Sequence, residues 1–169
     1  MNIQTFVKII ILSALAGLFA SGAFAQEVAH GNGALEIFDQ EGMANSPAWV
    51  RAWVGFMLAT FVVGLIFAFI RPEARFVMAP IILGFSVLII LSAGFGYAFP
   101  EVSGFIALVH LIFWTPALIM LLRNRWFLKE STWFGRWTGV LTFVILFSFI
   151  FDIRDAAIYV DHVAGLGLF

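Results

Sequence analysis

The chain has 169 residues, of which 63% are hydrophobic and only 11% are charged, and its net charge is −1. Soluble domains usually contain about 25% charged residues, so this composition excludes an ordinary water-soluble globule and predicts an integral membrane protein with the lipid bilayer as its first partner. The absence of cysteine excludes disulfides, thiolate metal sites, iron–sulfur clusters and covalently attached c-type haem within the chain. No basic block is present, so we expect no nucleic-acid partner.

Residues 1–25 have the pattern of a secretory signal peptide. Lys8 supplies the positive start, an apolar stretch follows, and Ala23-Phe24-Ala25 forms a small-residue cleavage site before an acidic, glycine-rich segment. The alternative is an uncleaved first transmembrane helix, because the apolar stretch is nearly long enough to cross a bilayer. Both alternatives place residues 26–47 outside, as a short periplasmic segment.

Four apolar stretches follow this segment. They cover about residues 48–70, 76–98, 103–122 and 133–155, and residues 163–169 form a periplasmic tail. Ser46 and Pro47 predict the start of the first helix, with the serine as N-cap and the proline at the first helical position. The connections are short, so consecutive spans should be antiparallel neighbours. We therefore predict an all-α membrane protein: a four-helix transmembrane bundle over residues 48–162, preceded by a signal peptide.

Basic residues predict the orientation of this bundle. The inner loops and their flanks hold most of them, namely Arg71, Arg75, Arg123, Arg125, Lys129 and Arg136. The outer side of the mature chain holds Arg51 and Arg154. This is the positive-inside pattern, and it agrees with the signal peptide. We expect a multi-pass protein of the bacterial cytoplasmic membrane with both mature termini in the periplasm; an organelle membrane is the alternative.

The fourth span poses a length problem. Its uncharged run, residues 137–151, is about 22 Å long at 1.5 Å per residue, whereas a hydrocarbon core is about 30 Å thick. One solution is that Arg136 reaches back to the inner headgroups. The other is that the helix carries Asp152, Arg154 and Asp155 into the outer leaflet. We expect both to contribute.

One histidine lies inside an apolar stretch. His110 lies about 10 Å below the outer end of the third span, Trp114 follows at i+4 on the same face, and Pro116 frees a backbone carbonyl nearby. An ionisable group at this depth is a functional-site hypothesis, so His110 and Trp114 are candidate ligands of a small molecule or cofactor. The alternative is a neutral imidazole that only packs the bundle by a hydrogen bond to another span. Candidate partners are the hydroxyls of Ser86, Ser92, Thr60 and Ser148.

A second polar group begins at the outer end of the fourth span. If the helix continues, Asp152, Asp155, Tyr159 and His162 fall at i, i+3, i+7 and i+10 and share one face. Carboxylates with an imidazole suit zinc, manganese or iron, so Asp152, Asp155 and His162 are a candidate metal site, and the whole stripe could also relay protons. The alternative is an ordinary helix end, in which Arg154 pairs with one aspartate and the rest is solvated.

These observations favour an accessory protein over an enzyme. No acidic or basic residue lies in the inner half of any span, so a proton route through the membrane is not supported. Pairs of small residues, Gly55 with Ala59 and Gly64 with Ala68, allow other helices to approach closely. We expect a non-enzymatic accessory or assembly subunit of a larger membrane complex, with other membrane subunits or further copies of the chain as partners.

The alternative function is ligand binding. In this reading the protein holds a haem, a quinone or another small molecule in a pocket near His110. A haem with two histidine ligands would need a partner chain, because His30 and His162 both lie outside the membrane. The face of the fourth helix from Asp152 to His162 would then guard the mouth of the pocket. The polar residues at the outer ends of the spans would cluster above His110, and they are Arg51, Glu101, Asp152, Arg154 and Asp155.

Overall fold

The computed structural model describes residues 33–37, 40–95 and 102–168. Within these ranges the chain is almost entirely helical, and its extended backbone is limited to one isolated antiparallel bridge between Ile37 and Val102. The predicted signal peptide lies outside the described residues. The elements in chain order are the 3-10 turn η1 (Gly33–Leu35), α3 (Gln40–Asn45), α4 (Ala48–Ile70), α5 (Pro72–Phe95), α6 (Ser103–Asn124), α7 (Trp126–Lys129) and α8 (Trp133–Ala164).

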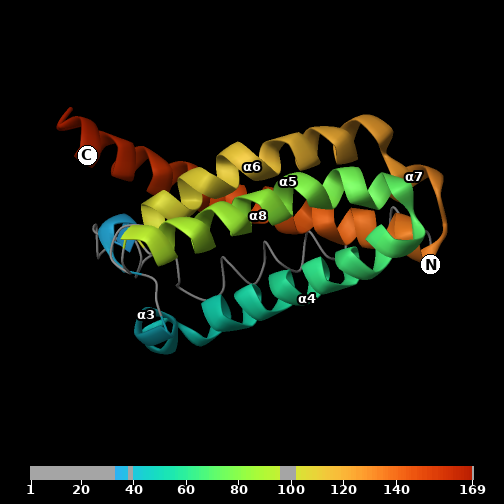
Figure 1. The fold of residues 1–169 in the computed structure, drawn as a ribbon, viewed down its shortest axis with the longest axis horizontal. Coiled ribbons are helices and arrows are strands. Elements are labelled where there is room, and N and C mark those ends of the chain that lie inside the picture. Colours follow the sequence, from blue (N-terminus) through green and yellow to red (C-terminus); the bar gives the residue numbers. More distant parts are fainter. Residues whose placement is uncertain (1–32, 38–39, 96–101, 169) are drawn as a thin grey trace.

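The four long helices α4, α5, α6 and α8 lie alongside one another, as Figure 1 shows. We call the end where α4 and α6 begin the acidic end, and the end that holds Arg71 and α7 the basic end. Three segments are long and apolar enough to cross a membrane, and they are residues 48–70, 72–91 and 103–129. The prediction of an all-helical chain is thus confirmed for the described residues, and three of the predicted spans have the length and composition needed to cross a membrane. The fourth predicted span, residues 133–155, stays a prediction.

The helix boundaries follow from local chemistry. The helix α4 has the bounds predicted for the first span, but Pro47, predicted at the first helical position, occupies the N-cap position and makes no side-chain cap. The predicted capping role of Ser46 is wrong, since its hydroxyl donates to the Gly42 carbonyl oxygen at 2.8 Å. The helix α5 begins at Pro72, four residues earlier than predicted, because the extended backbone of Arg71 alone makes the turn and proline suits a first helical position.

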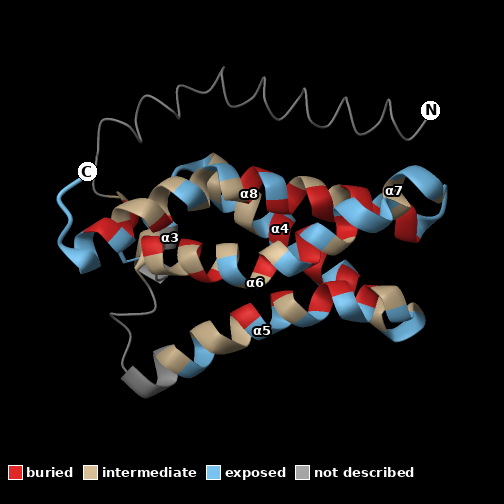
Figure 2. Cartoon of the chain, turned by 90° about the horizontal axis from the view of Figure 1, so that it is seen from above, coloured by how far each residue is buried: buried red, intermediate tan, exposed pale blue. Residues whose placement is uncertain are grey.

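The helix α8 contributes more side chains to the buried core than any other helix of the described chain. Its buried side chains, which include Trp137, Leu141 and Ile145, meet the buried faces of α4, α5 and α6 in one hydrophobic core. Figure 2 shows that buried positions concentrate along α8 and in the basic half of the bundle, whereas α5 diverges from its neighbours toward the acidic end. The outward side chains of α4 and α5 are large and apolar, and Phe69 is 84% exposed. Such a surface is suited to lipid.

The two small-residue pairs of α4 have different surroundings. Gly64 is buried, and a Cβ atom there would lie 2.6 Å from Met78 Sδ and 2.7 Å from Trp137 Cζ2. Gly55 is exposed, and a Cβ atom there would meet nothing within 4 Å. The pair of Gly64 and Ala68 therefore serves packing within the chain, and the pair of Gly55 and Ala59 faces outward.

This contrast yields a matched pair of substitutions. Gly64→Val forces Met78 and Trp137 apart and should lower the free energy of unfolding by about 1–3 kcal/mol, the usual cost of overpacking a core. Gly55→Val should leave it unchanged. Unfolding of the purified protein in mixed detergent micelles, followed by tryptophan fluorescence, measures both values, and equal effects of the two substitutions would contradict the packing described for Gly64.

Candidate functional site

The structure brings the buried histidine to a carboxylate on the neighbouring helix. His110 Nδ1 on α6 lies 3.3 Å from Asp152 Oδ2 on α8, and the two side chains are only 13% and 14% exposed. The helix α6 runs toward the basic end and α8 runs back, so residues far apart in the chain reach the same depth. The geometry lets the Nδ1–H group donate to the carboxylate, which leaves Nε2 on the opposite edge of the imidazole.

Trp114 fixes the imidazole from its face. The two rings are stacked, with centroids 3.9 Å apart and planes inclined by 20°, as the i+4 spacing predicts. Trp114 is fully buried and meets Phe61 of α4 edge-on at 5.3 Å and Phe85 of α5 at 6.1 Å. Its position is therefore set by three helices, and His110 is held both by a rigid ring and by Asp152. Nε2 of His110 has no hydrogen-bond partner among the described residues.

The hydroxyl groups expected to bind His110 are engaged elsewhere. The hydroxyls of Thr60 and Ser86 donate to carbonyl oxygens of their own helices at 2.9 Å. Ser148 contacts Met57 Sδ at 3.9 Å, and the side chain of Ser92 lies outside the described residues. Serine and threonine commonly bond back to their own helix in this way. The partner of the imidazole is instead the Asp152 carboxylate, which the sequence analysis placed in a separate group of residues.

The stripe on α8 is helical as predicted, and its members have different surroundings. Asp152 faces His110, Asp155 lies 3.3 Å from the Arg154 guanidinium, and His162 is exposed. Tyr159 is buried and packs edge-on against Phe105 of α6. The described residues contain no group of three histidine, aspartate or glutamate side chains placed to hold a metal ion. The structure thus joins Asp152 to His110 and does not gather Asp152, Asp155 and His162; metal binding by these three stays a prediction.

The other polar residues predicted at the outer ends of the spans, Arg51 and Glu101, add no described contact to the pair of His110 and Asp152. The Arg51 guanidinium donates to backbone carbonyl oxygens at the start of α4, including that of Ala44 at 2.9 Å. Glu101 lies outside the described residues. Arg51 is therefore occupied locally, and the polar site in the described part of the bundle consists of His110 and Asp152 with Trp114 beside them.

A close junction between α6 and α8 lies on the side of this site that faces the acidic end. Gly104 approaches α8 so tightly that a Cβ atom there would lie 2.5 Å from Tyr159 Cβ and 2.6 Å from the Asp155 carbonyl oxygen. The segment before α3 joins the same junction, because the Ser103 amide donates to the Glu36 carbonyl oxygen at 2.9 Å and Ala34 is fully buried. The described part of the N-terminal segment thus lies over the first turn of α6, about 10 Å from His110 along the helix.

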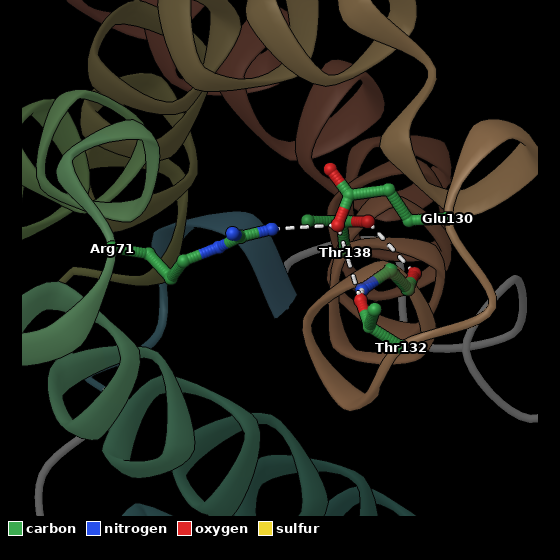
Figure 3. Close-up of polar contacts among 5 residues, drawn as sticks. Arg71, Glu130, Thr132 and Thr138 are labelled. Carbon is green, nitrogen blue, oxygen red and sulfur yellow. Dashed lines mark hydrogen bonds and ion pairs between the residues drawn. The ribbon is translucent and has the colours of Figure 1, made fainter.

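A second polar cluster ties together the basic end, and the sequence did not indicate it. Arg71, in the turn between α4 and α5, lies 2.6 Å from Glu130, and its guanidinium also lies over the Phe134 ring at 4.7 Å. The Thr132 hydroxyl donates to the same Glu130 oxygen at 3.1 Å and accepts from the Gly135 amide, which caps α8. Figure 3 shows these contacts. The figure draws the polar contacts and not the Phe134 ring. All of these contacts are structural, since they fasten one helical hairpin to the other.

No known protein family, curated protein or solved structure matches this chain. Its function is therefore argued from the residues and their geometry.

The pairing of His110 with Asp152 predicts energetic coupling between them. His110→Phe and Asp152→Leu each leave a polar group partnerless in the bundle, so the double variant should be more stable than the sum of the single effects by about 1–2 kcal/mol. His110→Phe combined with Ser86→Ala should show additive effects, because the Ser86 hydroxyl bonds to its own helix. Unfolding free energies in mixed micelles complete both cycles, and additivity in the first cycle would show that the two side chains do not interact.

Proposed function

We propose that this chain is a small four-span membrane protein that binds a membrane-soluble ligand through His110. The observation that supports this best is an imidazole held on two sides, by Asp152 at Nδ1 and by Trp114 at its face. A histidine whose one nitrogen donates to a carboxylate is oriented to use the other as a metal ligand or hydrogen-bonding group. At this depth the two fitting partners are a haem iron and the carbonyl oxygen of a quinone.

The proposal places α8 across the bilayer as the fourth span. Its 32 residues exceed the number needed, which is about 20. Its outward face stays apolar on both sides of the charged residues, and the exposed large side chains there are Leu146, Ile150, Ile153, Val160 and Val163. Asp152 and Asp155 are turned inward and largely covered. Intramembrane charges normally face the interior of a bundle, which removes the length problem, because lipid meets an apolar stripe longer than the uncharged run.

Charge supports the orientation within the proposal. The basic end holds six arginine or lysine residues and the acidic end holds Arg51 and Arg154. The positive-inside rule then places the basic end in the cytoplasm of a bacterium and the mature termini in the periplasm. His110 would accordingly lie in the outer half of the bilayer, and its ligand would enter from that leaflet.

Binding fits the interior of the bundle better than transport. Between Asp152 and the basic end, the buried polar side chains of α8 are Ser148, Thr142 and Thr138. The threonine hydroxyls donate to carbonyl oxygens of their own helix, at 2.7 Å for Thr142 and 2.8 Å for Thr138. Each donor is thus used within one turn, and Ser148 is separated from Thr142 by about 9 Å along the helix. This arrangement supports a site of half the membrane depth and no proton route across it.

A specific observation also supports the accessory-subunit function. The small residues Ala48, Ala52, Gly55 and Ala59 follow one another at helical spacing on α4, and all four are exposed. Helices approach one another closely at such residues in membranes. Because the other small pair of α4 already packs within the chain at Gly64, this face of α4 is the one left for a helix of another membrane subunit. The two functions are compatible, since a ligand-binding subunit can belong to a complex.

The ligand is tested on the purified full-length protein. We expect either a Soret band in the visible spectrum or a quinone in the organic extract, and we expect His110→Ala and His110→Gln to lose it while the elution profile of the protein is retained. Asp152→Asn should weaken binding about 10–100-fold, because a partner of the binding histidine is altered. A colourless preparation without extractable quinone, which also fails to bind added haem or quinone, would sink the ligand proposal.

The accessory role is tested by affinity purification from native membranes. Gly55→Leu should abolish co-purification of a stoichiometric membrane subunit, because the larger side chain prevents close helix approach, and should not change the stability of the isolated chain. Val62→Ala, on an adjacent exposed part of α4, is the control and should retain the partner. Purification of the chain alone from native membranes would contradict this role.

A further inference from the structure

We infer that the corner formed by α7 and the first turn of α8 binds an anionic phospholipid of the leaflet at the basic end. The corner is defined by residues 123–136, which carry four cations, Arg123, Arg125, Lys129 and Arg136. All four residues are exposed. The corner lies at one end of the bundle, where α6 passes through α7 into α8 (Figure 1).

The cations of this corner have no carboxylate partner among the residues that the structure describes. The lysine or arginine ion pairs in the described part of the chain are Arg71 with Glu130 and Arg154 with Asp155. Glu130 is the one acidic residue of the corner, and its carboxylate is committed to Arg71 and Thr132 (Figure 3). The contacts of Glu130 with Arg71 and Thr132 join the two helical hairpins. They thus engage the one negative charge that would otherwise neutralise the corner. A local excess of positive charge remains, directed at the membrane surface.

The backbone keeps these cations at the corner. Arg125 adopts the left-handed conformation (φ 53°), which ends α6 and begins α7. Its Nε donates to the Leu122 carbonyl oxygen at 3.3 Å, so the side chain is held beside the end of α6. The turn directs the chain across the end of the bundle, and the four cations consequently lie at the rim and not along a span.

Two exposed apolar side chains distinguish a lipid from a soluble anion. Trp133 is 75% exposed, and the Arg136 guanidinium lies over its ring at 4.8 Å from the centroid. Leu128 of α7 is also exposed. Tryptophan and arginine together suit the headgroup level of a bilayer, where one part of each side chain meets hydrocarbon and the other meets phosphate. Free phosphate, an acidic protein or a nucleic acid would match the charges and leave Trp133 and Leu128 without contact.

The acidic end provides the matched comparison. Arg51 donates to backbone carbonyl oxygens, and Arg154 pairs with Asp155. Both cations at that end are therefore neutralised or occupied within the chain. The charges that remain available to a headgroup lie at the basic end, and this inference is independent of any ligand at His110.

The experiment uses the full-length protein in neutral detergent and counts bound lipids by native mass spectrometry. Phosphatidylglycerol should bind more tightly than phosphatidylcholine with the same acyl chains. Each juxtamembrane cation contributes about a five-fold factor in affinity for an anionic surface, so the triple variant Arg125→Gln, Lys129→Gln and Arg136→Gln should bind phosphatidylglycerol about 100-fold more weakly. The double variant Arg51→Gln and Arg154→Gln should bind it as the wild type does.

Further arms separate the lipid from other anions. Inorganic phosphate and polyglutamate, added in excess, should not displace phosphatidylglycerol, and Trp133→Ala should weaken lipid binding several-fold. All substituted residues at the corner are exposed, so an unchanged elution profile and circular dichroism spectrum confirm folding. Equal binding of the two lipids, or unchanged binding by the triple variant, would overturn the inference. Displacement by phosphate or by polyglutamate would assign the corner to a soluble anion or an acidic protein instead.

Discussion

The opposition of His110 and Asp152 constrains how α6 and α8 pack. Each side chain alone would place an ionisable group in an apolar bundle, at a cost of several kcal/mol if it stayed charged, and each reduces that cost for the other only when the helices are in register. Gly104 and Ala107, both buried on the same face of α6, let the backbones come close enough for this contact. A slip of one residue would rotate the imidazole by about 100° and separate the pair. The register of these two helices therefore determines the site.

The two ends of the bundle handle charge differently, and this difference follows from the same packing. Near the acidic end, the carboxylates of Asp152 and Asp155 have partners within the chain, which are the His110 imidazole and the Arg154 guanidinium. At the basic end, Glu130 is used to fasten the turn after α4 to the corner before α8, which leaves the neighbouring cations directed outward. The ion pair that joins the two hairpins therefore leaves a net positive charge at the basic end. An electrostatic asymmetry along the bundle is the result, and it is larger than the net charge of −1 indicates.

Much of the fold could be predicted from the sequence, because apolar runs bounded by turn and charged residues give helix positions directly. The start of α6 at Ser103 agrees with prediction, whereas α5 begins earlier because one residue, Arg71, suffices for the turn. The site was predicted only in parts. His110 with Trp114 and the stripe from Asp152 were separate hypotheses, since 42 positions divide His110 from Asp152 and no periodicity relates residues on different helices. Position along the helices did not relate them either, because His110 lies about 10 Å from the start of α6 at Ser103 and Asp152 lies about 18 Å from the end of α8 at Ala164.

The helix α8 shows why the length of an uncharged run is an incomplete measure of the apolar surface of a helix. A run of residues averages over all faces of a helix, whereas lipid contacts only one of them. The inward face of α8 carries Asp152 and the buried hydroxyls, and its outward face carries Ile150, Ile153 and Val160, so the polar residues shorten the run without shortening the apolar surface. A surface helix of a soluble protein has the opposite arrangement, with its apolar face inward and its polar face outward. A span interrupted by charge is consequently a reason to look for the partner of that charge on another helix, and here the partner is the one histidine within the described bundle interior.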